Sequence, residues 1–214
     1  MFGNRVVMEQ SLFGLDFLRQ FDQSVLFAIN GLHFFILDKV MWLISSKTFW
    51  IPFYVMLAGF LGYRFGVRRT ILILLSIALI ITLADQTCAT FIRPFFERLR
   101  PSHPDNPDSV FIHLVNGYRG GSYGFPSCHA ANTAALTVFI ILVTRLRWLG
   151  AVMITWMVAV CYSRMYLGVH YPTDILVGAT VGSFYSVVVY YAYKAVSRRL
   201  HLQPERVSLK ASGV

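Results

Sequence analysis

The sequence predicts an all-α, multi-pass membrane bundle of five or six transmembrane helices, folded as a single membrane-embedded domain over residues 1–214. Hydrophobic residues make up 56% of the chain and charged residues only 14%, with a mean hydropathy of +0.58. Soluble domains carry about 25% charged residues, so this balance indicates a membrane protein. A second observation supports this: short basic clusters, rather than long polar linkers, separate most of the apolar stretches.

The basic residues predict the orientation in the membrane. The net charge of +9 is also compatible with nucleic-acid binding, but no soluble face is left to carry such a patch. We therefore expect a multi-pass protein of the cell (inner) membrane, with no nucleic-acid partner and no obligate protein partner. The clusters lie where the positive-inside rule places cytoplasmic loop ends: Arg64, Arg68 and Arg69; Arg145 and Arg147; Lys194, Arg198 and Arg199; Arg206 and Lys210.

The N-terminal region is the least regular part of the pattern. Residues 1–23 are expected to form an interfacial arm, because Leu12 to Phe21 places apolar residues at helical spacing among charged ones. A frayed cytoplasmic arm is the alternative. The composition of this arm does not predict a cleaved signal peptide. Ser24 to Ser45 is apolar but interrupted, and fits either one poor spanning helix or a short segment followed by a bent one.

The remaining spans follow more clearly. Phe49 to Tyr63 has aromatic ends but is short for the ~20 residues that a bilayer core requires. Thr70 to Leu99 is expected to be one helix of about 45 Å, whose end projects beyond the ~30 Å hydrocarbon core. Three further spans and a cytoplasmic tail complete the chain: Ser127 to Thr144, Trp148 to Leu167, Tyr171 to Val196, and the tail at 197–214.

Residues 100–125 form the long polar connection, rich in proline and glycine, and are expected to lie outside the cytoplasm. A loop of this length without its own elements is more often functional than idle. Alternate threading of the spans brings this loop to the same rim as the end of the Thr70–Leu99 helix and the turn before Tyr171. The basic clusters fall on the opposite face. Polar residues that do not suit a membrane therefore converge on one extracytoplasmic rim.

Three clusters at this rim have the residue types of a phosphoryl-transfer site. Arg93 and Arg100 are seven residues apart, so both guanidiniums are expected to project from one side of the helix end. Ser127 is a candidate N-cap of the next helix, whose first N–H groups and dipole bind anions, and His129 lies in its first turn. His170 and Asp174 are one helical turn apart.

The surroundings of His170 complete this set. Pro172 favours a helix start, so Asp174 can orient the imidazole of His170, with Arg164 on the preceding helix. Charge clamps, a nucleophile and an acid are what in-line phosphoryl transfer without a metal requires. The three cysteines, Cys88, Cys128 and Cys161, show no paired spacing, so neither a disulfide nor a zinc site is expected.

These clusters resemble the three signature motifs of the type 2 phosphatidic acid phosphatase (PAP2) family, which shares its phosphate pocket with vanadium haloperoxidases. The family pattern is Lys, six residues, Arg-Pro; then Pro-Ser-Gly-His; then Ser-Arg, five residues, His, three residues, Asp. The chain has Arg93, six residues, Arg100-Pro101; then Pro126-Ser127-Cys128-His129; then Ser163-Arg164, five residues, His170, three residues, Asp174. The resemblance spans Thr70 to Val196.

The chain departs from the family at two positions. Arg93 stands where the family has lysine, which keeps the charge but changes a point donor into a planar fork. Cys128 stands where the family has glycine, which adds a side chain but keeps the backbone N–H. A thiol at a helix N-terminus can have a lowered pKa, yet we expect Cys128 to be a neighbour of the phosphate rather than a nucleophile.

The resemblance implies a haloperoxidase-like helical core and a membrane lipid phosphatase that needs neither metal nor cofactor. His170 would attack phosphorus to give a phosphohistidine, Asp174 would hold its imidazole, and His129 would protonate the departing lipid oxygen. The phosphate oxygens would be bound by Arg93, Arg100, Arg164, Ser127 and the amide of Cys128. The site would face the periplasm or exterior.

The substrate is implied only as a phosphorylated membrane lipid. Undecaprenyl diphosphate, phosphatidylglycerophosphate and lipid A phosphate all present a terminal phosphate or diphosphate at that depth. A lipid phosphotransferase that uses the same phosphohistidine is the closest alternative. A lipid or anion transporter would explain the arginines and an intramembrane acid, but not the spacing of His129, His170 and Asp174.

Several polar residues outside the motifs have open roles. Asp85 lies in mid-helix, where an acid is either functional or paired with a polar residue such as Lys39 or Asn30. Arg119 either contacts a second phosphate or the headgroup, or stabilises its own loop. Arg98 and Glu97 are expected to pair with each other's neighbours and to need no catalytic part.

Overall fold

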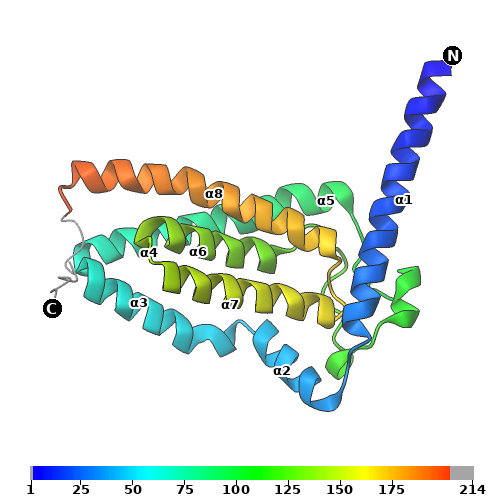
Figure 1. The fold of residues 1–214 in the computed structure, drawn as a ribbon, viewed down its shortest axis with the longest axis horizontal. Coiled ribbons are helices and arrows are strands. Elements are labelled where there is room, and N and C mark those ends of the chain that lie inside the picture. Colours follow the sequence, from blue (N-terminus) through cyan, green and yellow to red (C-terminus); the bar gives the residue numbers. More distant parts are fainter. Residues whose placement is uncertain (1, 203–214) are drawn as a thin grey trace, which may run out of the picture.

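A computed structural model describes the backbone of residues 2–202 and the side chains of residues 16–202. Over these residues the fold is all-α, as predicted, and an isolated bridge between Leu99 and Tyr123 is the nearest approach to a sheet (Figure 1). The α-helices are α1 (Phe2–Asn30), α2 (Phe35–Ser45), α3 (Ile51–Phe65), α4 (Val67–Gln86), α5 (Arg93–Phe96), α6 (Cys128–Thr144), α7 (Arg147–Tyr166) and α8 (Pro172–Arg199).

The long helices form an elongated bundle with two distinct ends (Figure 1). Helices α4, α6, α7 and α8 each extend from one end to the other. Helices α2 and α3 follow the same direction as two consecutive helices. The α3–α4 and α6–α7 turns, which carry predicted cytoplasmic arginines, lie at one end. Helix α1 and the loop of residues 100–125 lie at the other end, so the two ends differ as the threading predicted.

Helix α6 is the centre of the bundle and packs against α4, α7 and α8. Its apolar residues, such as Phe139 and Ile140, are fully buried in the main core. The approach of α8 is unusually close, because a Cβ on Gly178 or Gly182 would overlap the α6 backbone at Ser127 or Ala131. These glycines allow the starts of α6 and α8 to lie in contact, which joins two of the three motifs.

The spans agree with the sequence in outline. Val67–Phe96, Arg147–Tyr166 and Pro172–Arg199 are long and apolar enough to cross a membrane, and α6 is apolar but shorter. Asp16–Asn30 and Phe35–Ser45 meet that test only as a pair, with a bend of 118° between them. Of the two alternatives for the region up to Ser45, the structure therefore has two segments with a bend. The number of spans, five or six, stays a prediction.

The predicted arm and tail differ from the observed helix bounds. Helix α1 continues without a break from Phe2 to Asn30, so residue 23 is not a boundary. It lies across the end of the bundle, the orientation that a helix in the membrane plane would have (Figure 1). At the other terminus α8 continues to Arg199, and residues 203–214 of the predicted tail lie outside the described part.

The helix predicted for Thr70 to Leu99 begins and ends earlier. Helix α4 starts at Val67 and continues through a π-helical segment, Thr87–Ile92, into α5, which ends at Phe96. Glu97 then adopts a left-handed conformation with φ 43°, which ends the helix. The Arg100 N–H donates to the Ser122 carbonyl across the loop at 3.0 Å. The expectation that Arg93 and Arg100 project from one helix is therefore wrong.

Candidate active site

The start of α8 fixes the position of His170. Pro172 is the first residue of the helix, as predicted, and the Tyr171 N–H donates to Oδ2 of Asp174 at 2.9 Å. His170 lies just before this cap, with 1% of its surface exposed. Its Nδ1 is 3.5 Å from Oδ2 of Asp174, close enough for an ion pair but longer than a good hydrogen bond. The carboxylate that was predicted to orient the imidazole is thus beside it.

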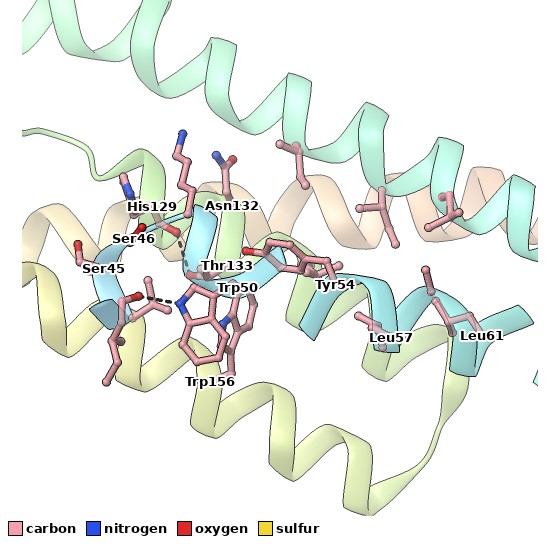
Figure 2. A pocket seen from close by; sticks show the side chains of 18 residues that line it. Ser45, Ser46, Trp50, Tyr54, Leu57, Leu61, His129, Asn132, Thr133 and Trp156 are labelled. Carbon is pink, nitrogen blue, oxygen red and sulfur yellow. Dashed lines mark hydrogen bonds between the residues drawn. The ribbon is translucent and has the colours of Figure 1, made fainter. Parts of the chain in front are cut away.

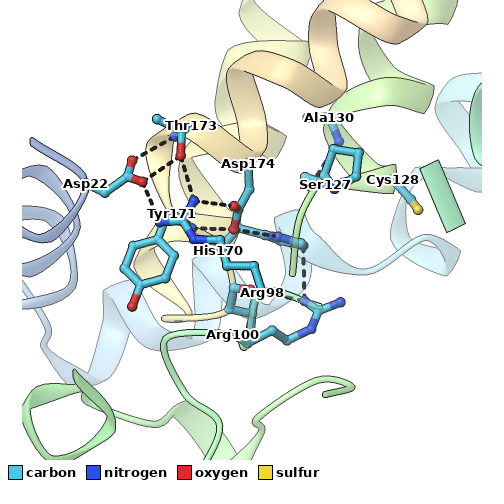
Figure 3. A network of polar contacts seen from close by, with 12 residues as sticks. Asp22, Arg98, Arg100, Ser127, Cys128, Ala130, His170, Tyr171, Thr173 and Asp174 are labelled. Carbon is cyan, nitrogen blue, oxygen red and sulfur yellow. Dashed lines mark hydrogen bonds and ion pairs between the residues drawn. The ribbon is translucent and has the colours of Figure 1, made fainter. Parts of the chain in front are cut away.

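Arg98 holds this carboxylate, a role that the sequence did not reveal. Its Nη1 donates to Oδ1 of Asp174 at 2.9 Å, and its Nη2 pairs with Oδ2 of Asp22 at 2.5 Å (Figure 3). Asp22 also accepts the N–H of Thr173 at 2.9 Å. This cation joins α1 to the first turn of α8, and the expectation that Arg98 needs no catalytic part stays a prediction. No local spacing relates residues 22, 98 and 174.

Arg100 lies on the opposite side of His170 from Asp174. It is buried, and its Nη1 lies 3.1 Å from Nε2 of His170 and donates to the Val169 carbonyl at 3.1 Å. The loop packs tightly over this pair, since a Cβ on Gly124 would lie 3.1 Å from Oδ2 of Asp174 and 3.2 Å from Cγ of Arg100. A neutral His170 accepts the Arg100 hydrogen bond through Nε2, so Nε2 is the nitrogen that faces the cations.

The start of α6 faces this same group of cations. Ser127 is the N-cap, as predicted, and its Oγ accepts the Ala130 N–H at 3.4 Å. From α5, Arg93 reaches across to α6, where its Nη2 donates to the Pro126 carbonyl at 3.2 Å and contacts Sγ of Cys128 at 3.0 Å. The thiol that replaces the family glycine therefore contacts the arginine that replaces the family lysine.

Arg164, at the end of α7, is the third arginine of this group. We refer to Arg93, Arg100 and Arg164 together as the basic wall. Arg164 is buried and donates to the hydroxyl of Ser45 on α2, a contact that the sequence did not predict. The Nε atoms of Arg93, Arg100 and Arg164, and Nδ1 of His170, are buried and have no hydrogen-bond partner among the described residues. Unpaired buried donors are costly, so this arrangement favours an anion that accepts from several sides.

The electrostatics of the loop groups reflect this crowding of positive charge. Burial, and then the charges of Arg100, Arg164 and Arg93, hold the pKa of His170 well below its ordinary value of 6.5. Burial and the neighbouring Arg164 lower the pKa of Arg100 to about 10. His170 is therefore a neutral imidazole at physiological pH, with the lone pair that a nucleophile needs.

An apolar cavity of about 330 Å³ opens beside this basic wall (Figure 2). His129 lies at its polar end, and the walls come from α2, α3, α4, α6 and α7. Leu57 and Leu61 line the far end, and Trp156 lies along one side (Figure 2). The cavity places hydrocarbon-lined space next to the histidine that was predicted to be the acid.

The residues with open roles also have defined positions. The Arg119 guanidinium donates to the Ser102 carbonyl at 2.6 Å, which stabilises the loop. Asp85 accepts from the Asn132 amide at 3.1 Å, so it is paired with a polar residue, as one alternative held, although the partner is neither Lys39 nor Asn30. Asn30 instead binds the His113 loop and the end of α7.

In the part of the chain that the structure describes, we looked at the groups that could form a disulfide or bind a metal. All three cysteines are free thiols, and Cys88 is fully buried. No three His, Cys, Asp or Glu side chains between residues 16 and 202 gather as a metal site requires. The site is built from guanidiniums, imidazoles and helix N–H groups.

Comparison with known proteins identifies the family. The PAP2 superfamily model matches residues 69–198. The chain is similar to a lipid A 4'-phosphatase of Bacteroides thetaiotaomicron, with 40% identity over 87% of this chain and 83% of that protein. It is also similar to a lipid A 4'-phosphatase of Porphyromonas gingivalis, with 33% identity over 84% of this chain and 75% of that protein.

A solved structure supports the fold independently. The crystal structure of a transmembrane PAP2-type phosphatidylglycerolphosphate phosphatase from Bacillus subtilis aligns with a TM-score of 0.58 at 21% identity. The alignment covers 90% of this chain and 96% of that one. The chain therefore belongs to the PAP2 superfamily and is a membrane phosphatase that hydrolyses phosphoric esters.

Proposed function

We propose that this enzyme removes a phosphate monoester from a lipid A-type glycolipid, at the periplasmic face of the inner membrane. The observation that carries the proposal is the set of buried guanidinium Nε atoms, on Arg93, Arg100 and Arg164, that have no acceptor among the described residues. A tetrahedral phosphate offers acceptors to all of them at once. The names of the two relatives at 40% and 33% identity supply the lipid class.

The first step of the proposed reaction forms a phosphohistidine. Nε2 of His170, which faces Arg100 at 3.1 Å, attacks phosphorus, and the bond between phosphorus and the sugar oxygen breaks. His129, which takes up a proton when the anionic phosphate binds beside it, gives that proton to the departing oxygen, which leaves as a neutral alcohol. The three guanidiniums and the α6 N–H groups stabilise the charge on the equatorial oxygens.

The second step regenerates the enzyme. His129, now neutral, accepts a proton from water as the water oxygen attacks phosphorus, and the bond between Nε2 and phosphorus breaks. Inorganic phosphate leaves, and His170 returns to its neutral form. The basic wall repels a metal cation. It therefore supports a reaction in which guanidiniums rather than a metal neutralise the phosphate.

The apolar cavity supports a lipid rather than a soluble substrate. It begins at His129, the group next to the departing oxygen, and continues between α3 and α4 toward the bilayer interior. An acyl chain of the departing glycolipid fits such a space, because its burial there removes apolar surface from water. The predicted orientation, with basic turns at the opposite end, supports a periplasmic site.

The test is phosphate release by purified protein in mixed micelles, with a lipid A-type glucosamine phosphate as substrate. We expect His170→Ala to abolish turnover, with a loss of at least ~10³-fold, and wild-type enzyme quenched during turnover to carry an acid-labile phosphohistidine that His170→Ala lacks. Normal turnover by His170→Ala would contradict the nucleophile. Phosphate that appears on a second lipid instead of in solution would indicate a phosphotransferase.

A further inference from the structure

Asn132 is a half-buried polar residue that the proposed reaction does not use. It lies three residues after His129 on α6, so both side chains occupy the same helix face. Both line the polar end of the apolar cavity, as Figure 2 shows. Its Oδ1 is buried and accepts no hydrogen bond from any described residue. A buried acceptor left unpaired is costly, so it needs a donor from elsewhere.

Asp85 determines which way the Asn132 amide points. Oδ1 of Asp85, on α4, accepts from Nδ2 of Asn132 at 3.1 Å. A flipped amide would bring the Asn132 oxygen against this carboxylate, which the like partial charges disfavour. The intramembrane acid that the sequence left unexplained thus holds the amide nitrogen and leaves the amide oxygen as a fixed acceptor.

The position of this acceptor relates it to one part of the substrate. In an in-line displacement the leaving group departs on the side opposite the attacking nitrogen, next to the group that protonates it. His129 has that role in the proposed function, on which this inference rests. The atoms next to the departing oxygen therefore lie near Asn132.

We infer that Asn132, held by Asp85, forms a subsite that accepts a hydrogen bond from an O–H or N–H group of the leaving group. The ligand class is a neutral sugar or amide next to the scissile phosphate. An ionised prenyl phosphate leaving group offers only acceptors and meets the Asp85 carboxylate unfavourably. Lys47 lines the same end of the cavity, but its residue is exposed and can turn its charge toward solvent.

The test compares Asn132→Leu with the wild-type enzyme on two readouts. The first is kcat/KM for the glucosamine lipid phosphate, which we expect to fall by about 10- to 100-fold, because the substrate donor then lies buried without a partner. The second is the inhibition constant of vanadate, a phosphate analogue without a leaving group. We expect this inhibition constant to stay within about twofold of the wild-type value, because the substitution leaves the basic wall unchanged.

A matched control is Thr137→Val, further along α6 and not among the residues that line the cavity. The Thr137 hydroxyl donates to the Met153 carbonyl at 3.2 Å, so its removal changes a polar contact of α6 without affecting the pair of Asp85 and Asn132. We expect kcat/KM of this variant to stay within about threefold of wild type. Asp85→Leu should reproduce most of the Asn132→Leu loss, because it frees the amide to flip.

Each other result counts against the inference. Unchanged kcat/KM in Asn132→Leu would overturn it while leaving the proposed function intact. Equal losses in kcat/KM and in affinity for vanadate would show that Asn132 only supports the basic wall. A wild-type enzyme that hydrolyses prenyl diphosphates but not the glucosamine lipid would overturn both the proposed substrate and this subsite.

Discussion

Replacement of Arg98 by glutamine tests whether the bridge between α1 and α8 supports catalysis. Arg98 is the cation between Asp22 and Asp174, whose side chains are 2% and 0% exposed. Removing one partner of a fully buried ion pair costs about 3–5 kcal/mol. Arg98 itself is 30% exposed, and both carboxylates keep backbone N–H donors, so water and these donors offset part of the loss. We expect a loss of about 1–3 kcal/mol in stability.

The effect on activity follows from the 3.5 Å separation between Asp174 and His170. Without Arg98 the carboxylate is held only by the Tyr171 N–H and can move away from the imidazole. We expect kcat to fall by about 10- to 100-fold, which corresponds to about 1.4–2.7 kcal/mol in the barrier. The vanadate inhibition constant should change little, since Arg98 is not among the guanidiniums proposed to bind phosphate.

The assay is steady-state phosphate release together with thermal unfolding in the same detergent. Arg19→Gln is the matched control, because Arg19 is an exposed arginine on α1, and it should leave both readouts unchanged. Asp22→Asn should lower stability but keep kcat within about threefold, since the contact between Arg98 and Asp174 survives. Wild-type kcat in Arg98→Gln would refute the positioning role, and an equal rise in the vanadate constant would show a general collapse of the site.

Three further predictions follow from the site and its supports. Because the pKa of His170 lies well below 6.5, the acid limb of kcat/KM that belongs to this residue should lie below pH 6.5. As the pH falls through 6.5, the His170 imidazole binds a proton in the unfolded chain but not in the folded one. Stability should therefore drop on acidification by up to about 1.4 kcal/mol per pH unit from this group. A stability difference between wild type and His170→Gln that does not vary with pH would contradict this. EDTA should leave turnover unchanged and vanadate should inhibit competitively, as phosphate release measures directly; loss of activity in EDTA that zinc or magnesium restores would reject the metal-free reaction. Gly178→Ala should cost about 1–3 kcal/mol and lower kcat/KM, because the added methyl overlaps the Ser127 carbonyl and displaces the phosphate-binding start of α6; a variant as stable and as active as wild type would show that the helices can separate there freely.

The sequence was most informative where the physical cause is local. Pro172 starts α8 and Ser127 caps α6 because both signals act within one helical turn. The spacing of the three motifs predicted which side chains would meet, and the structure does bring Arg93, Arg100 and His170 to one wall. Apolar length predicted the long helices within a few residues of their observed ends.

The misses have non-local or conformational causes. Glu97 adopts a left-handed conformation that no glycine or asparagine signalled, so Arg100 was placed on a helix that had already ended. Asp22 and Arg98 meet only because α1 lies across the end of the bundle, a tertiary arrangement without a sequence period. The partner of Asp85 is Asn132 on α6, and no spacing in the sequence distinguishes it from the other polar residues of the bundle.

The cavity wall that α2 and α3 supply has a consequence for how specificity can change. The family match covers residues 69–198, whereas Ser45 and the residues from Trp50 to Leu61 that line the cavity lie before it. The residues of the candidate phosphate site and one wall of the proposed lipid cavity are therefore encoded in separate stretches of the chain. A chimera that exchanges residues 1–68 between relatives would change the proposed lipid preference while keeping the reaction centre, and an acid at position 22 would keep the stabilising pair with Arg98.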